Sequence, residues 1–291
     1  MKPFSVLLVL LLAFGGGYLG AFGRGQSPGL ATAHESAGAR VVRTRVLRCA
    51  YTVWPPFIDK DIVTGQTHGL YADYTEAVAK HLGLKVVWAA TVITGQETEP
   101  LRAGKADALC LHGAWNGAAN LAARFSAPVL LDAVGIFART DDSRFDDPRA
   151  INQSTTRFAA IDGDVSQDLA QTHFPAARFD SLPQAADNTM LVQDVLARKA
   201  DLTIIDKWLA QHDRAINGVR LKQVGPQPAL AYYAVSFGVL PEDEPLANLL
   251  SQATRDLRNT GLEDSVFRPY DQLFRDGALA RISGDVSLRR F

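Results

Sequence analysis

The 291-residue sequence is poor in cysteine and methionine, with two of each, and its 30 basic and 31 acidic residues leave a formal net charge of −1. Such a balance does not suit a nucleic-acid partner. The six histidines are scattered, and none has metal-ligand spacing with a cysteine or a carboxylate. The sequence contains no Gly-x-Ser-x-Gly motif, no Walker motif and no internal repeat. It therefore predicts no metal site, no cofactor and no enzymatic activity.

The chain has one long apolar run, from Phe4 to Phe22, which follows Lys2. Residues 1–25 are therefore predicted to be a targeting segment, either a cleaved signal peptide or a retained membrane anchor. The small-x-small sequence Ala31–Ala33 offers a cleavage site, although it lies far downstream of the run. Both alternatives imply export of the folded part. Residues 26–44 are rich in glycine, alanine and serine and are predicted to be a flexible linker.

A short strand is predicted where the apolar content resumes, at Val46–Tyr51. The loop after it contains Pro55 and Pro56, which cannot donate hydrogen bonds to a sheet, so the strand must end before them. Tyr51 and Trp54 then lie at the carboxyl end of the strand. In open α/β sheets this edge is where ligands bind.

The next segments alternate between helix and strand. Residues 70–82 place apolar side chains on one helical face, and Gly83 ends that helix. Strands are predicted at residues 86–90 and 107–111, with a short helix ending at Gly104 between them. This βαβαβ order predicts an α/β fold.

The order and spacing of the motifs resemble those of the family 3 solute-binding proteins of ABC transporters, over roughly Val46 to Tyr270. The motifs that carry the resemblance are Trp54-Pro55-Pro56-Phe57, Gly69-Leu70 with Asp73, Leu101–Asp107 with Gly104, Phe125-Ser126-x-Pro128, Ile161-Asp162-Gly163, Ala200-Asp201-Leu202 with Asp206, and the closing helix Leu246–Gly261.

This resemblance implies a two-lobe periplasmic binding protein fold of type II, in which two hinge strands cross between the lobes. The crossing strands are expected at residues 129–139 and 230–240. The implied boundaries are residues 45–138 for the first part of lobe 1, 139–230 for lobe 2, 231–271 for the return to lobe 1, and 272–291 for a C-terminal extension.

The resemblance also implies a ligand site between the lobes. In the family, the position of Asp206 receives the ligand's amino group, although Asp206 is also placed to cap the helix after it. Tyr51 and Trp54 from lobe 1, with Trp115 and Asn116 at a loop tip, complete the expected ligand contacts on that side.

The chain departs from the amino-acid binders of this family at two positions. Ala119 stands where those proteins carry the arginine that clamps the ligand's carboxylate. Gly163 and Asp164 stand where Gly-Ser or Gly-Thr helps to hold it, and Asp164 with Gln167 also forms a capping-box pattern. Gly163 and Asp164 remain expected ligand contacts, and the added carboxylate favours a cationic or neutral ligand.

The two cysteines, Cys49 and Cys110, fall on the first and third strands, which are sheet neighbours in the fold that the resemblance implies. Their side chains are therefore either joined in a disulfide, which an exported compartment permits, or buried as two small apolar groups.

The predicted function is capture of a small polar ligand, amino-acid-like or cationic or neutral, for uptake by an ABC transporter permease. The predicted location is the periplasm, with the N-terminal segment as a potential anchor in the inner membrane. Two alternatives stay open. One is a membrane-anchored sensor or interaction module with a degenerate cleft. The other is an enzyme on the same fold that resembles cyclohexadienyl dehydratase.

Overall fold

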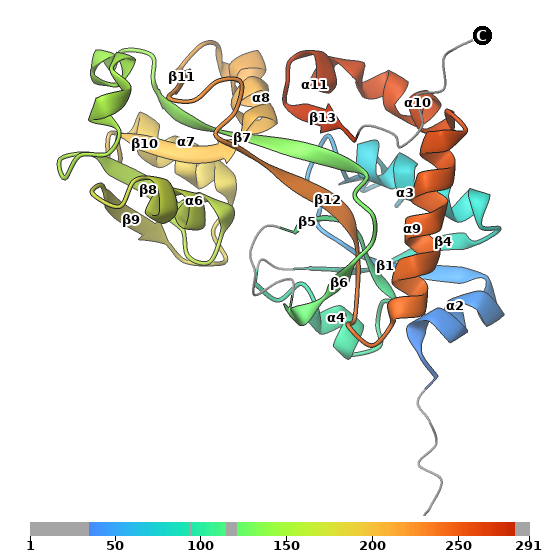
Figure 1. Cartoon of the computed structure of the whole chain (residues 1–291). Coiled ribbons are helices and arrows are strands. Elements are labelled where there is room, and N and C mark those ends of the chain that lie inside the picture. Colours follow the sequence, from blue (N-terminus) through green and yellow to red (C-terminus); the bar gives the residue numbers. More distant parts are fainter. Residues whose placement is uncertain (1–34, 93–94, 115–120, 283–291) are drawn as a thin grey trace, which may run out of the picture. The chain divides into compact units, whose positions relative to one another are not determined.

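The computed structural model describes residues 35–92, 95–114 and 121–282. The predicted targeting segment, Trp115 and Asn116 lie outside the described residues. Within the described part, strands form one eleven-stranded mixed sheet whose main order is β4-β1-β5-β12-β7-β10-β8-β9. Figure 1 shows β7 and β12 running side by side between two groups of elements, which are called lobe 1 and lobe 2 below.

Lobe 1 begins with β1 at its centre, paired in parallel with β4 on one side and with β5 on the other. The loop after β1 turns back at Trp54, whose backbone N–H donates to Ile58 O at 2.7 Å, and the next helix starts after Gly69. Gly69 has φ +113°, and a Cβ there would lie 2.5 Å from Phe57 O, so only glycine allows this approach. The elements of this part are α2 (Ala37–Thr44), β1 (Val46–Tyr51), β2 (Asp59–Lys60), β3 (Thr67–His68), α3 (Leu70–His81), β4 (Lys85–Thr91), α4 (Glu99–Arg102), β5 (Ala108–Ala114) and β6 (Arg124–Phe125).

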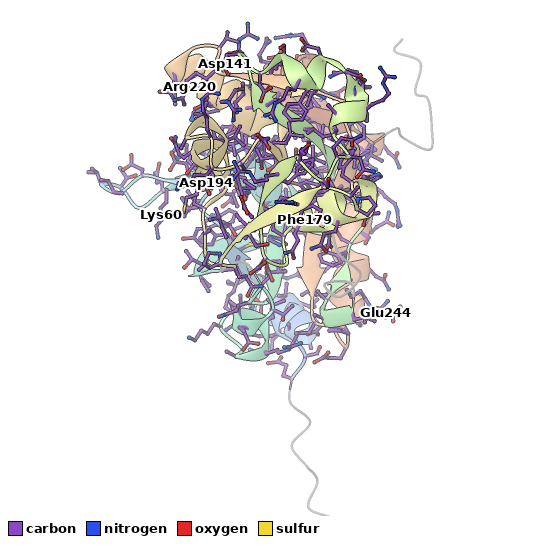
Figure 2. The ribbon with its side chains drawn as sticks, turned by 90° about the vertical axis from the view of Figure 1, so that its left-hand side faces the viewer. Lys60, Asp141, Phe179, Asp194, Arg220 and Glu244 are labelled. Atoms are coloured by element: carbon purple, nitrogen blue, oxygen red, sulfur yellow. A yellow bond between two sulfur atoms is a disulfide. The ribbon has the colours of Figure 1, made fainter. Side chains whose placement is uncertain are left out.

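Lobe 2 lies between the two crossing strands along the chain. Its strands β8, β9 and β10 pair in the order β10-β8-β9 with parallel neighbours, as connections through helices require. Figure 2 marks Phe179 on β9 and Asp194 on α7 in this lobe, and Lys60 on the projecting β2–β3 hairpin of lobe 1. The elements are η1 (Ser143–Asp146), η2 (Pro148–Ala150), β8 (Arg157–Ile161), α6 (Val165–His173), β9 (Arg178–Leu182), α7 (Asn188–Leu196), β10 (Leu202–Asp206), α8 (Lys207–Asn217) and β11 (Leu221–Val224).

The crossing strands are β7 (Leu130–Arg139) and β12 (Ala231–Val239), close to the ranges that the sequence predicts. The first half of β7 pairs antiparallel with β12, and its second half pairs with β10 and β11 of lobe 2. The other end of β12 pairs with β5 of lobe 1. Strand β7 therefore joins the strands of lobe 2 to β12, and β12 joins β7 to lobe 1, within one continuous sheet.

The C-terminal segment is an integral part of the sheet rather than an appendage. Beyond α9 (Glu244–Asn259), α10 (Leu262–Phe267), η3 (Arg268–Tyr270) and α11 (Asp271–Arg275), strand β13 (Leu279–Arg281) pairs with Leu130–Asp132 of β7. The expected extension at 272–291 therefore contributes a strand beside the hinge as far as Arg281. Sequence reasoning assigned no structure here, because a three-residue strand has no detectable periodicity.

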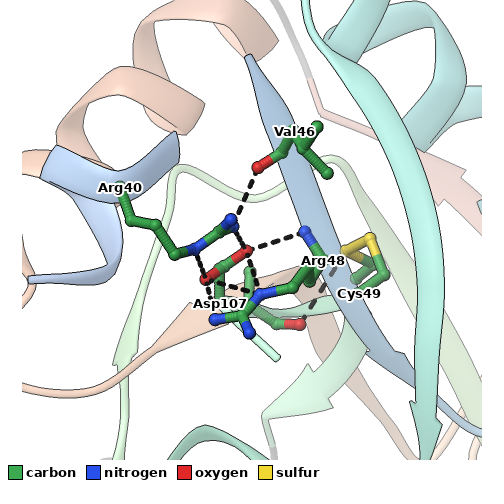
Figure 3. Close-up of a disulfide and its surroundings, with 7 residues drawn as sticks. Arg40, Val46, Arg48, Cys49 and Asp107 are labelled. Atoms are coloured by element: carbon green, nitrogen blue, oxygen red, sulfur yellow. Dashed lines mark hydrogen bonds and ion pairs between the residues drawn. A yellow bond between two sulfur atoms is a disulfide. The ribbon is translucent and has the colours of Figure 1, made fainter. Parts of the chain in front are cut away.

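The predicted flexible linker is wrong for its last part, because residues 37–44 form helix α2. Ser36 caps the helix by accepting a hydrogen bond from the Ala39 N–H at 3.2 Å, and Val41 is fully buried. Arg40 reaches from this helix to Asp107, and Arg48 of β1 bonds the same carboxylate at 2.8 Å. Figure 3 shows both guanidinium groups around Asp107. Composition alone suggested a tether, and this tertiary contact overrides it.

Cys49 of β1 and Cys110 of β5 form a disulfide with a Cα–Cα distance of 5.3 Å, visible beside Asp107 in Figure 3. The bond follows from register: Cys49 pairs with Ala108, and Cys110 lies two residues further along the same strand, on the same face. Both sulfurs are buried in lobe 1. The disulfide alternative is thus confirmed.

No helix in the described ranges has both the length and the apolar content needed to cross a bilayer. Nor do the described residues contain a group of three or more histidine, cysteine or acidic side chains placed to hold a metal ion.

Candidate functional site

The register of the crossing strands brings three polar side chains onto one face of the sheet. Tyr233 of β12 pairs directly with Asp132 of β7, so their side chains point the same way. Asp206, the last residue of β10, pairs with Val134 of β7. Because strand faces alternate, Asp206 shares the face of Asp132, two residues along β7. A site at the junction of both lobes results.

The hydroxyl of Tyr233 lies between the two carboxylates. Its oxygen is 2.8 Å from Asp206 Oδ1 and 3.2 Å from Asp132 Oδ2. Asp132 is 2% exposed and Asp206 is 3% exposed. The second oxygen of Asp132, Oδ1, is buried and has no hydrogen-bond partner among the described residues. A buried acceptor in this condition costs free energy unless a ligand or a proton satisfies it.

Burial raises the pKa of both carboxyl groups. The pKa of Asp206 rises to about 7 because desolvation outweighs the hydrogen bond from Tyr233, and the negative charge of Asp164 adds to the rise. Desolvation and then the charge of Asp206 raise the pKa of Asp132 well above its usual value. Burial and the two carboxylates also raise the pKa of Tyr71 and of Tyr233. These groups therefore occupy one electrostatic environment.

Aromatic side chains from both lobes border this acidic group. Trp208, the second residue of α8, lies 5.8 Å from Trp54 and 5.1 Å from Phe57 by ring centroids. Phe57 in turn stacks on Tyr71 at 4.6 Å. Trp208 is 4% exposed, and its indole N–H has no partner among the described residues. The aromatic-proline loop of lobe 1 thus contacts the start of α8 in lobe 2.

Asp164 acts as the N-cap of α6, because its Oδ1 accepts a hydrogen bond from the Ser166 N–H at 2.9 Å. The backbone N–H of Gly163 donates to Gln167 Oε1 at 3.0 Å, which occupies the donor expected for an anionic ligand. Desolvation raises the pKa of Asp164. The structure therefore makes this helix end acidic and links it electrostatically to Asp206.

The ring contact of Tyr51 is with another residue of lobe 1 and not with the other predicted site residues. Tyr51 is buried in lobe 1, where its ring meets Trp88 edge-on at 5.3 Å. The structure therefore brings together Trp54, Asp164 and Asp206 through Trp208 and the acidic group, and it assigns Tyr51 a packing contact. Asp206 occupies the N-cap position of α8, as the capping alternative expects, but its side chain makes no cap hydrogen bond.

Basic groups near the acidic pair are directed elsewhere. The ammonium of Lys207 donates to Pro228 O at 2.8 Å, and burial lowers the pKa of this lysine. Within residues 35–92, 95–114 and 121–282, no lysine, arginine or histidine forms an ion pair with Asp132 or Asp206. The site thus carries excess negative charge that a bound cation would balance.

Sequence reasoning missed Asp132 and Tyr233. Asp132 is the only charged residue inside the apolar stretch Val129–Ala138, and a carboxylate in a strand that must be buried is a detectable signal. Tyr233 carries no such signal, because tyrosine is common in strands. Its role depends on the register of β12 against β7.

A surface depression of about 980 Å³ lies elsewhere, lined by residues at the end of α2, along α3 and at the start of β4. It shares no residue with the acidic group. Asp132 and Asp206 are each at most 3% exposed, so the acidic group is enclosed in this conformation.

A family model described as bacterial extracellular solute-binding proteins, family 3, matches residues 47–281. The match includes β13, which extends the resemblance beyond Tyr270. No curated protein matches the chain.

Solved structures share the fold at low sequence identity. An ancestral amino acid-binding protein, described as a precursor of cyclohexadienyl dehydratase, is 21% identical with a TM-score of 0.65, covering 80% of this chain and 98% of that one. The VFT2 domain of Bordetella pertussis BvgS is 18% identical with a TM-score of 0.65, covering 80% and 96%. An amino acid ABC transporter substrate-binding protein of Streptococcus pneumoniae, bound to L-arginine, is 16% identical with a TM-score of 0.64, covering 82% and 98%.

Proposed function

Because this chain belongs to family 3 of the bacterial extracellular solute-binding proteins, we propose that it captures a small cationic or neutral polar solute between its lobes and presents it to an ABC transporter. The two-lobe type II fold supports this mechanism. Lobes joined by two strands move by changes in a few backbone dihedrals near those strands. Closure then removes water from the ligand's polar groups, and the closed form is the one that a permease recognises.

The observation that carries the proposal is the buried acidic pair at the lobe junction. Asp132 and Asp206 are each at most 3% exposed, and no basic side chain in the described part of the chain pairs with them. Burying two carboxylates this way is unfavourable for stability alone. A ligand that supplies positive charge or hydrogen-bond donors offsets that cost. The aromatic rings of Trp54 and Trp208 add a surface that attracts cations.

A thermal-shift panel of amino acids, amines, guanidinium compounds, sugars and carboxylates tests the proposal. A ligand of the folded state raises Tm by mass action, with a stabilisation of about 2.7 kcal/mol at a hundredfold excess over Kd. We expect cationic or neutral polar compounds to raise Tm and acidic amino acids to leave it unchanged. Calorimetry on the best compound then gives the stoichiometry, which is expected to be one per chain.

Asp206→Asn serves as the site variant, and Asp180→Asn is the matched control. Asp180 is an exposed residue on β9 of the same lobe, 3.8 Å from Arg157. The site variant is expected to lose the Tm response and the control to keep it. Tight binding of acidic amino acids without binding of amines overturns the proposed ligand class. A panel in which no compound binds overturns solute capture.

The periplasm is the proposed compartment, in keeping with the extracellular family and with the disulfide. N-terminal sequencing of the mature protein decides whether residues 1–25 remain attached and contact the membrane. A start after the apolar run identifies a cleaved signal peptide, and an intact N-terminus identifies an anchor.

One observation favours an enzyme as a second candidate. A carboxyl group whose pKa lies near 7, as burial makes that of Asp206, is suited to general acid catalysis. A dehydratase of prephenate-like acids would also need a positively charged side chain to hold the substrate's carboxylates. Among the described residues no such side chain pairs with Asp132 or Asp206. Turnover of prephenate, followed by absorbance, decides between the candidates, and we expect none.

A further inference from the structure

We propose that Asp132 and Asp206 form a single two-carboxylate site for a hydrogen-bonding organic cation, a primary ammonium or a guanidinium, and that this cation replaces a proton shared by the pair. The inference rests on the proposed function, and it adds the recognising residue Asp132, the chemical class of the ligand and a linkage to pH.

The shared proton follows from the donor count around Tyr233. A phenol has one O–H, so it donates to only one acceptor at a time. Its oxygen lies within hydrogen-bonding distance of Asp206 Oδ1 and of Asp132 Oδ2. If Tyr233 donates to Asp206 over the shorter distance, the contact with Asp132 is favourable only when Asp132 carries a proton and donates it. If both carboxylates were ionised, the single Tyr233 O–H could satisfy only one of them. The other oxygen–oxygen contact would then have no hydrogen between its two atoms.

Within the described residues, the elements packed on the pair supply no compensating positive charge. Strand β12 supplies Tyr233, α3 supplies Tyr71, and the start of α6 supplies Asp164, all neutral or negative. On α8, Lys207 is directed to Pro228 O. The pair therefore repels a second negative charge, and burial raises the pKa of both carboxyl groups.

The neighbouring strands β13 and β5 each carry a basic residue near the pair. Arg281 of β13, whose strand pairs with β7 at Leu130–Asp132, bonds Asp264 and Asp271. His112 of β5 lies next to Gly113, against which the Tyr233 ring packs, and its side chain points to the opposite face. A Cβ at residue 113 would lie 2.4 Å from Tyr233 Cε2, so glycine there fixes the position of the hydroxyl. Neither basic residue is a recorded partner of the pair.

Unsatisfied groups at the site indicate what the ligand carries. Among the described residues Asp132 Oδ1 is a buried acceptor without a partner, so the ligand must offer an N–H or O–H donor there. An ammonium or guanidinium offers several donors together with the positive charge. A quaternary ammonium offers charge without donors and would leave Asp132 Oδ1 unpaired. The buried indole N–H of Trp208, also without a partner in the described part, is available to an acceptor elsewhere on the ligand.

Binding then exchanges one cation for one proton. The unliganded pair holds a proton at pH values below its upper pKa, and the liganded pair holds the cation instead, so the proton passes to solvent. Apparent affinity is therefore expected to rise about tenfold per pH unit while the pair is protonated and to become constant above that range. No covalent bond changes.

The test uses agmatine as the probe, with choline as the quaternary control and L-glutamate as the anionic control, by calorimetry on the full mature protein. Titration at pH 8, where Asp206 is mostly ionised and the pair holds about one proton, in two buffers of different ionisation enthalpy gives the number of protons released. We expect agmatine to bind with release of about one proton. Choline is expected to bind at least tenfold more weakly, because each charge-assisted hydrogen bond corresponds to about 10- to 150-fold in affinity.

Asp132→Asn keeps the shape of the side chain and removes its charge. It is expected to weaken agmatine by about 10- to 150-fold and to abolish most of the proton release, and Asp180→Asn is expected to change neither. A merely structural role for Asp132 would change affinity without changing the proton count. Circular dichroism and Tm of the variant confirm that it folds.

Three results overturn the inference while leaving solute capture intact. They are equal affinity of choline and agmatine, unchanged proton release in Asp132→Asn, and absence of agmatine binding at millimolar concentration when another compound of the panel binds. As a ligand-free check, infrared titration of the unliganded protein is expected to show a carboxyl proton at pH 8 that is lost in Asp132→Asn. Its presence in that variant also overturns the inference.

Discussion

Reduction of the Cys49–Cys110 disulfide is expected to destabilise the protein substantially. The bond links residues 61 positions apart in sequence. The chain-entropy model for closing such a loop gives about 4 kcal/mol at about 25 °C, through restriction of the unfolded chain. For a chain of this size about 1 kcal/mol corresponds to about 2–4 °C, so Tm is expected to fall by about 8–16 °C.

Comparison of oxidised and reduced wild-type protein isolates the covalent bond, because both forms keep the two sulfur atoms in the core. Both cysteines are at most 1% exposed, so the protein is unfolded in denaturant with reductant and refolded in reductant before measurement. Urea unfolding followed by circular dichroism gives the midpoint and the slope of each form. The reduced form is expected to show the steeper slope, because its unfolded state is less compact.

The double variant Cys49→Ala/Cys110→Ala serves as the control, since reductant should not change its unfolding curve. It also measures the packing contribution of the sulfurs relative to the reduced wild type. If oxidised and reduced wild-type proteins unfold at the same urea concentration, the loop-entropy reasoning is refuted for this bond.

Three further perturbations follow from the contacts described above. Asp107→Ala removes a buried carboxylate bonded by Arg40 and Arg48, and urea unfolding is expected to show a loss of about 3 kcal/mol; a loss below about 1 kcal/mol contradicts the network. Without ligand, Tm is expected to fall as pH rises from about 4 to about 7, because the raised pKa of Asp206 makes the folded state bind more protons than the unfolded state in that range. Asp206→Asn should make Tm less dependent on pH. An unchanged dependence in this variant argues against the raised pKa of Asp206. Trp208→Phe removes an N–H that has no partner among the described residues, so it is expected to lower the free energy of unfolding by less than about 1.5 kcal/mol. Trp208→Ala also removes the ring packing and is expected to lower it by about 3–5 kcal/mol, and equal losses in urea unfolding would contradict the packing role.

The sequence predicted the order of elements well where local patterns and motifs agreed. The strand at Val46–Tyr51 has the expected bounds, and the crossing strands differ from the expected ranges by at most one residue at each end. These segments combine apolar content with turn residues at their ends, which is the pattern that local reasoning detects. For the two cysteines the implied fold left two alternatives, a disulfide or two buried thiols, and the structure shows the disulfide.

The rest depended on contacts between distant parts of the chain. Helix α2 has a composition typical of a tether, and its order comes from Asp107 and from burial of Val41. The sequence predicts only one residue of the acidic pair as a ligand contact. Asp206 is predicted from the family motif, whereas Asp132 falls in a stretch predicted only to be an apolar strand. Strand register, which sequence patterns do not specify here, places the two on one face.

The position of the disulfide separates two properties that a covalent cross-link often couples. It joins β1 to β5, both in lobe 1, and bridges neither crossing strand. Oxidation therefore strengthens one half of the molecule and imposes no constraint on rotation of that half against the other. Protein with reduced cysteines is therefore expected to undergo the same lobe motion as the oxidised protein, although its Tm is lower.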